Sequence, residues 1–162
     1  MCIRDSFIEE FSNEAFADKY AEGPTRVQFK SIDPRGWLEF RNHLAEHSIR
    51  GSVLTMRGVQ ARRPSLYDLE DQMRQLTVPT LILTGDEDEP CLIPGVFMNR
   101  LIRSSAFITL ANAGHTINLE VPDEFNQAVD QFLTQVRSGR WPVREAATEA
   151  GGSILGMNED QS

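Results

Sequence analysis

The first half of the chain reads as a series of amphipathic helices. Four stretches place apolar residues at steps of three and four, a spacing that predicts helices with one buried face. Each stretch begins at a side chain able to cap a helix. The expected caps are Ser6, with Glu9 at capping-box spacing, Asp33 before Pro34, Ser52, and Ser65. We expect the first helix to run to about residue 21, and residues 22–32 to form a polar connection.

The second half changes from helical period to short apolar runs. Residues 80–84 form a continuous β-prone run bounded by Pro79 and Gly85, which predicts a buried parallel strand. A helical stretch over about 94–103 and a second run over 106–110 complete one βαβ unit. After a loop, Pro122 begins a long amphipathic helix that ends near Gly139.

Two strands are few for a parallel sheet, which is normally built from several strands covered on both faces. About 75 residues of helices precede the first strand. The sequence therefore predicts an α/β fold whose sheet is incomplete within this chain.

Composition narrows the class of protein. The 162 residues include 16 Lys+Arg and 24 Asp+Glu, with a net charge of −8, which fits one ordinary domain and excludes a large two-domain enzyme. An acidic chain lacks the basic patch of a nucleic-acid binder. No apolar run approaches the roughly 20 residues that span a bilayer. Two cysteines and no signal sequence favour a reducing cytoplasm, and the composition leaves the oligomeric state open.

Asp88 and His115 are the strongest candidates for chemistry. Asp88 follows the first strand and His115 follows the second. Parallel strands end at the same edge of a sheet, about 4.8 Å apart, so their loops can bring a carboxylate to an imidazole. Such a pair makes a general base, because the carboxylate fixes the tautomer and stabilises the imidazolium. Asp86, in the same loop, is the alternative acid.

Two other features fit ordinary structural roles better than functional ones. His43 and His47 have the spacing of a two-histidine metal face, but Leu44 stands where a zinc protease has Glu, and no third ligand is evident. Cys91 follows the acid loop without a histidine near it in sequence, so we expect a buried structural thiol.

Two segments resemble the α/β-hydrolase superfamily. Residues 78–88 (VPTLILTGDED) look like its acid-bearing strand and loop, and residues 113–126 (AGHTINLEVPDEFN) look like its Gly-His turn leading to the final helix. The Gly-x-x-Asp register of the resemblance implies Asp88 as the acid and His115 as the base. It also implies a small-molecule substrate and a reaction that needs no cofactor and no metal.

The resemblance also implies a domain division. Residues 1–64 would be a helical cap, 65–138 the C-terminal part of the hydrolase core, and 139–162 a flexible tail. Residues 1–6 resemble a peptide translated from sequencing-adapter DNA; the alternative is that they begin the first helix. Within the cap, Trp37, Phe40 and Met56 have the spacing of core residues, with an acyl pocket as the alternative.

One motif of the superfamily is missing from the sequence. No Gly-x-Ser-x-Gly turn is present, and residues 151–156 (GGSILG) have the wrong spacing and follow no strand. We therefore expect a partial α/β-hydrolase fold, a helical cap followed by a terminal βαβα unit, without the N-terminal core strands. The parent would hydrolyse an ester or related bond with a nucleophile, serine or aspartate, that this chain lacks, leaving it inactive alone. The alternative is a non-catalytic helical binding module with a small βαβ end.

Overall fold

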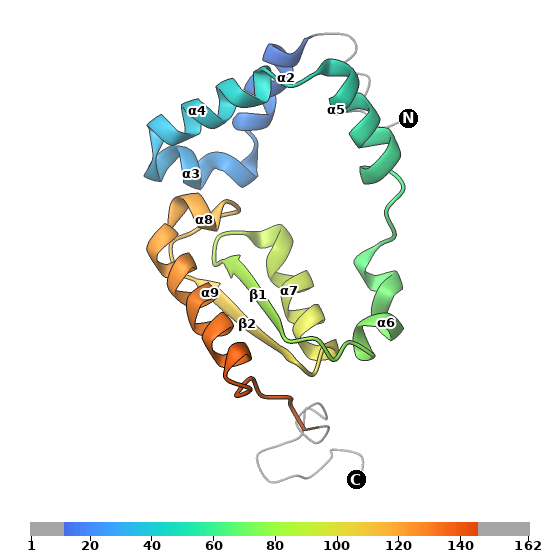
Figure 1. The fold of residues 1–162 in the computed structure, drawn as a ribbon. Helices are drawn as coiled ribbons and strands as arrows, with labels where there is room; N and C mark the ends of the chain where they lie inside the picture. The colour runs from blue at the N-terminus through green and yellow to red at the C-terminus, as the bar shows by residue number, and fades with distance from the viewer. Residues whose placement is uncertain (1–11, 146–162) are drawn as a thin grey trace, which may run out of the picture.

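A layer of helices and a small α/β unit make up the protein, which a computed structural model describes over residues 12–145. Figure 1 shows the helical layer lying across one end of the sheet. The helices of this layer are α2 (Asn13–Ala21), α3 (Val27–Ile32), α4 (Pro34–Ala45) and α5 (Ile49–Thr55). A 3-10 turn over Pro24–Arg26 precedes α3, and a π-helical turn over Met56–Gln60 continues α5. A 3-10 turn over Leu66–Leu69 and helix α6 (Glu70–Arg74) lead to the sheet.

Two of the expected helix caps are confirmed. The Asp33 carboxylate accepts a hydrogen bond from the Gly36 N–H at 2.9 Å, at the start of α4. Ser65 forms a capping box with Asp68 before the 3-10 turn. The expected cap at Ser6 lies outside the described residues.

The cap expected at Ser52 is wrong. Helix α5 begins at Ile49, four residues before the start that a cap at Ser52 implies, and Ser48 accepts the hydrogen bond from the Gly51 N–H at 3.2 Å. Ser48 has the extended backbone that an N-cap needs, whereas Ser52 lies inside the helix. Within the first predicted helix, Ser12 has a non-helical backbone and caps α2, which ends at Ala21 as expected; residues 6–11 of that prediction lie outside the described part of the chain.

The connection expected to be polar and irregular contains α3. This short helix buries Phe29, whose side chain is almost fully covered. The Phe29 ring packs against the Phe40 ring of α4, with 6.3 Å between the ring centroids. Packing of one aromatic side chain against α4 therefore stabilises a helix that the local sequence pattern does not indicate.

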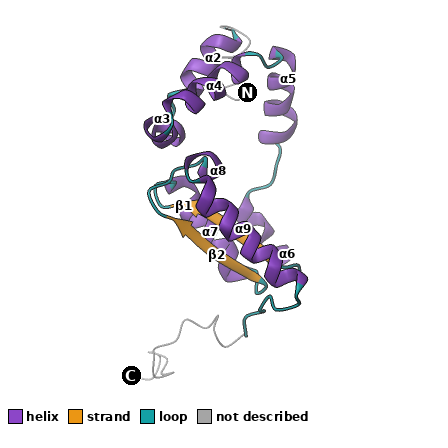
Figure 2. Ribbon diagram, turned by 60° about the vertical axis from the view of Figure 1, so that its left-hand side comes forward, coloured by secondary structure: helices purple, strands orange, loops and turns teal. Residues whose placement is uncertain are grey.

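The predicted βαβ unit is confirmed. Strands β1 (Thr80–Gly85) and β2 (Ser105–Leu110) pair in parallel, with Thr80 opposite Ser105 and Gly85 opposite Leu110. Helix α7 (Glu89–Leu101) connects them and begins earlier than expected, because Pro90 suits its first turn. After a short helix α8 (Ile117–Glu120), α9 (Pro122–Arg137) returns along the sheet. Figures 1 and 2 show α7 and α9 on opposite sides of the two strands.

The sheet is incomplete within the described residues, as the sequence predicts. It contains two strands, and β1 has β2 as its one described neighbour. An apolar groove of about 540 Å³ lies between β1 and α9. Its lining includes Leu81 and Leu83 of β1 and Phe125, Val129 and Leu133 of α9. The first strand is therefore only partly covered here, unlike the fully buried strand that its apolar run predicts.

Residues 141–144 are held against the α/β unit, although the sequence pattern suggests a loosely attached tail. The Trp141 Nε1–H donates to the Ser104 carbonyl at 2.6 Å, and its ring packs edge-on against Phe132 with centroids 4.7 Å apart. Arg144 Nη2 donates to the Ile102 carbonyl at 2.8 Å. The rest of the expected tail, residues 146–162, lies outside the described part of the chain.

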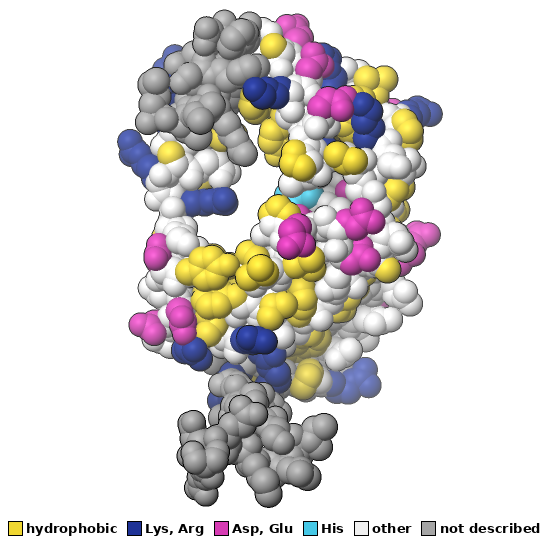
Figure 3. Space-filling view, turned by 180° about the vertical axis from the view of Figure 1, so that it is seen from behind, with side chains coloured by type: hydrophobic (Ala, Val, Ile, Leu, Met, Phe, Trp, Pro, Cys, Tyr) yellow, Lys and Arg dark blue, Asp and Glu magenta, His cyan; other side chains and the backbone are white. Residues whose placement is uncertain are grey.

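The surface of the α/β unit carries apolar side chains. Seen from behind, hydrophobic side chains gather on the half of the molecule that holds the sheet (Figure 3). Exposed Tyr67, Ile93 and Val96 line a hollow of about 340 Å³ beside α7.

None of the helices in residues 12–145 combines the length and the apolar character needed to cross a bilayer.

Candidate active site

The structure brings Asp88 and His115 together at the carboxyl edge of the sheet. Asp88 Oδ2 lies 2.9 Å from His115 Nδ1, across 27 residues of sequence. The Asp88 side chain is 5% exposed and that of His115 is 38% exposed. A buried carboxylate thus holds one nitrogen of a ring that still reaches solvent. This is the arrangement of an oriented general base.

Asp86, the alternative acid, has a different partner. Its Oδ1 accepts the backbone N–H of Ala113 at 3.1 Å, and the Glu87 N–H donates to the Ala113 carbonyl at 3.0 Å. Backbone hydrogen bonds from Ala113 and Asn112 lower the pKa of the Asp86 carboxyl below its usual value. Asp86 therefore ties the acid loop to the histidine turn, and the contact with His115 comes from Asp88.

Glu120 shapes the histidine turn, a role that the sequence reasoning does not assign. Its side chain is 5% exposed and accepts the backbone N–H groups of Gly114 and Thr116. It also accepts the Thr116 hydroxyl at 2.5 Å. The sequence signal is a glutamate five residues after His115, near enough along the chain to fold back onto the N–H groups of the turn.

Cys91 lies next to His115 and is half-buried, whereas the sequence places no histidine near it along the chain and favours a buried structural thiol. Cys91 lies in the first turn of α7, and its Sγ lies 3.7 Å from His115 Nδ1. Burial, followed by the hydrogen bond and charge of Asp88, raises the pKa of the Cys91 thiol to about 11. At neutral pH the group is a protonated thiol and a poor nucleophile.

The two other histidines show no metal-binding arrangement. Within residues 12–145, the group of three side chains close enough to share a metal ion is Asp88, Cys91 and His115. It includes neither His43 nor His47. The backbone carbonyl of His47 accepts a hydrogen bond from the Asn13 side chain.

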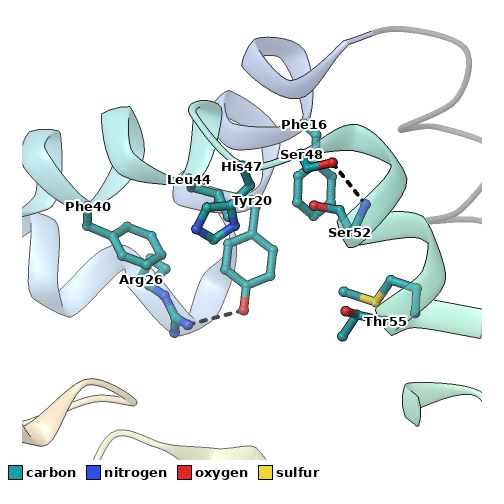
Figure 4. A pocket seen from close by; sticks show the side chains of 11 residues that line it. Phe16, Tyr20, Arg26, Phe40, Leu44, His47, Ser48, Ser52 and Thr55 are labelled. Atoms are coloured by element: carbon teal, nitrogen blue, oxygen red, sulfur yellow. Dashed lines mark hydrogen bonds between the residues drawn. The ribbon is translucent and has the colours of Figure 1, made fainter. Parts of the chain in front are cut away.

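The helical layer contains a cavity of about 520 Å³ (Figure 4). Phe16, Tyr20 and Phe40 supply aromatic walls, and Met56 lines another side. Helical spacing alone favours a packed core for Phe40 and Met56, but in the structure both side chains line a cavity. Buried Arg26 lies over the Tyr20 ring, 5.2 Å from its centroid, and its Nη2 donates to the Tyr20 hydroxyl at 3.2 Å.

The helical layer also contacts the loop that carries the histidine. Gln28 of α3 donates through Nε2 to the Asn112 carbonyl at 3.4 Å, three residues before His115. Helices α3 and α8 pack against each other. The layer therefore borders the site that Asp88 and His115 form.

Comparison with curated proteins gives two relatives that match part of the chain. A proline iminopeptidase from Saccharolobus solfataricus is 26% identical over 115 residues, covering 71% of this chain and 34% of the relative. A putative 2-succinyl-6-hydroxy-2,4-cyclohexadiene-1-carboxylate synthase from Bacillus subtilis is 30% identical over 74 residues, covering 46% and 26% respectively. No family profile matches the chain.

Three solved structures share its fold. MenH from S. aureus superposes with a TM-score of 0.77 at 24% identity, over 83% of this chain and 50% of that one. Bromoperoxidase from Bacillus anthracis gives 0.64 at 22% identity, over 80% and 46%. Est816, described as an N-acyl homoserine lactone degrading enzyme, gives 0.60 at 20% identity, over 82% and 52%.

These relatives and structural neighbours are α/β-hydrolases, and the chain carries part of the α/β-hydrolase fold. It spans about half the length of the solved structures, and the matches cover 34% and 26% of the two curated relatives. The resemblance found in residues 78–88 and 113–126 is therefore confirmed at the level of the superfamily and its fold.

Proposed function

We propose that the protein to which this chain belongs hydrolyses an ester or a related bond of a small molecule. The observation that carries the proposal is the contact of buried Asp88 Oδ2 with Nδ1 of the solvent-accessible His115, at 2.9 Å. A protonated Nδ1 donating to Asp88 leaves Nε2 as the free base. That tautomer is the one required for general-base catalysis.

In this reaction His115 moves protons between three groups. Its Nε2 takes the proton of the nucleophile and delivers it to the leaving group. It then takes a proton from the hydrolytic water and returns it to the nucleophile as the intermediate breaks down. Asp88 stays ionised and stabilises the imidazolium at each step. The chemistry requires neither a metal nor an organic cofactor.

The nucleophile of the proposed reaction lies on a segment outside these 162 residues. Gly-x-Ser-x-Gly is absent from all 162 residues, so we propose a serine on such a turn elsewhere in the parent, with an aspartate as the alternative. The chain alone should then be inactive. His115 would have a nucleophile to activate only in the parent protein.

We further propose that the helical layer is the cap of the parent enzyme. It borders the histidine loop through the Gln28 contact with Asn112, and its aromatic-lined cavity has the size and lining of a small-molecule site. The acidic composition and the two cysteines support action in a reducing cytoplasm on a substrate other than nucleic acid.

The test begins with the source locus, read in frame upstream of the codon for Phe7. If it encodes strands and a nucleophile turn, the extended protein should hydrolyse aryl esters, and the 162-residue chain should not. H115A and D88N in the extended protein should each lower kcat/KM by about 10³ or more. E87Q, which changes an exposed carboxylate in the same loop, is the matched control and should keep activity. Full activity in H115A would refute the proposal.

The non-catalytic binding module remains the second candidate function. The open apolar groove between β1 and α9 favours it, because an exposed strand edge beside apolar helices can pair with another chain. A stop codon directly before Met1 would favour this reading. So would an extended protein that binds a partner through the groove and has no esterase activity.

A further inference from the structure

The proposed reaction leaves the Cys91 thiol unused, although it lies at the centre of the site. Its Sγ is 3.7 Å from His115 Nδ1, the same nitrogen that lies 2.9 Å from Asp88 Oδ2. The three potential ligand atoms all lie within 4.8 Å of one another. Sulfur, imidazole nitrogen and carboxylate oxygen are the ligand types that zinc binds.

The two distances from His115 Nδ1 lie near those of a tetrahedral ion. Zinc bonds of about 2.0 Å to nitrogen and oxygen and about 2.3 Å to sulfur place nitrogen and oxygen about 3.3 Å apart, and nitrogen and sulfur about 3.5 Å apart. The observed 2.9 Å and 3.7 Å differ from these values by a few tenths of an ångström. Side-chain rotation alone can supply such shifts.

A second observation points to a cation at this place. Asp88 Oδ1 is buried and has no hydrogen-bond partner among the described residues, and the whole side chain is 5% exposed. A buried carboxylate with one unpaired oxygen is costly unless positive charge compensates it. A divalent ion between Asp88 and Cys91 would supply that charge.

We propose that Asp88, Cys91 and His115 form a binding site for a thiophilic divalent metal ion, best matched by zinc. Solvent supplies the fourth ligand through the exposed side of His115. On binding, the Cys91 S–H bond breaks, an S–metal bond forms, and the proton passes to the buffer. The His115 proton moves from Nδ1 to Nε2 through solvent, so that Nδ1 can bind the ion.

The site should therefore switch the dyad off. The bound ion takes the Nδ1 that Asp88 otherwise holds and leaves Nε2 protonated, which removes the free base. This consequence rests on the proposed function. The proposed metal binding does not rest on the proposed function, because it needs no nucleophile.

Cobalt titration of the purified chain tests the proposal, because cobalt shares zinc's ligands and absorbs visible light. We expect saturation at one ion per chain, a thiolate-to-cobalt charge-transfer band, and displacement by zinc. C91S should abolish the charge-transfer band. C91S and D88N should each weaken binding by at least about tenfold, since even outer-sphere partners are worth that much. Circular dichroism checks that the variants remain folded.

Matched variants make the test specific. C2S removes the other thiol of the chain and E87Q removes a neighbouring carboxylate, and both should bind cobalt as the unaltered chain does. A charge-transfer band that survives in C91S but disappears in C2S would overturn the proposal, as would the absence of saturable binding. If the extended protein binds cobalt but hydrolyses no ester, that result would refute the proposed function and leave the metal site unaffected.

Discussion

Gly85 lies so close to Ala113 that a β-carbon at residue 85 would fall 2.0 Å from the Ala113 carbonyl oxygen. It would also fall 2.4 Å from the carbonyl oxygen of Gly114. The end of β1 and the histidine turn are therefore in backbone contact. Only glycine permits this approach, which sets where Asp88 and His115 meet.

We expect G85A to destabilise the fold by about 1–3 kcal/mol, because backbone atoms must move to admit the methyl group. The matched control is G58A, since a β-carbon at Gly58 meets nothing within 4 Å and that glycine lies in a helical turn. Urea denaturation of both variants checks this prediction. Equal stability of G85A and G58A would contradict it.

Glu120 should position the histidine turn without taking part in chemistry. E120A leaves the N–H groups of Gly114 and Thr116 unpaired, so we expect a loss of about 1.5–3 kcal/mol, typical of hydrogen bonds to a buried charged group. E124Q, at an exposed glutamate of α9, should stay within about 0.5 kcal/mol of the unaltered chain. Thermal unfolding measures both. An unchanged melting temperature in E120A would contradict this prediction.

The Asp86 carboxylate should make stability depend on pH in the acid range. Its pKa in the folded protein is lowered from 3.8, so folding favours the ionised form. The resulting stabilisation is present above the unfolded pKa and is lost as the pH falls through the folded pKa. D86N should therefore melt at a lower temperature than the unaltered chain at pH 7, and the gap should narrow below pH 3.8. A gap that stays constant with pH would contradict this.

Cys91 should react slowly with alkylating reagents near neutral pH. With a thiol pKa of about 11, raised chiefly by burial, the thiolate fraction increases about tenfold per pH unit up to that value. Iodoacetamide labelling, followed by mass spectrometry of the peptide that contains Cys91, should show this rise. D88N should speed labelling at pH 8, because Asp88 also raises the thiol pKa. Fast labelling at pH 7 would contradict the half-buried, protonated state of the Cys91 thiol.

The sequence by itself determined the order βαβα, the cap at Asp33 and the two residues of the candidate base. These features depend on neighbours within a few positions: a period of apolar residues, a capping side chain, or a polar residue after a strand. The Gly-x-x-Asp and Gly-His motifs likewise involve only residues a few positions apart in the chain. They were sufficient to place Asp88 and His115 at one edge of the sheet.

The packing of the elements decided the contact of Cys91 with His115 and the formation of α3, which depend on groups brought close in space rather than in sequence. The hydrogen bonds of Glu120 and the choice of Ser48 over Ser52 join residues three to six positions apart, but the sequence patterns did not single them out. The Cys91 side chain, 24 residues from His115, reaches its Nδ1 because the parallel pairing of β1 and β2 puts the start of α7 and the histidine turn at the same edge of the sheet. Local pattern carries no information about such distances, since they arise when the elements pack against one another.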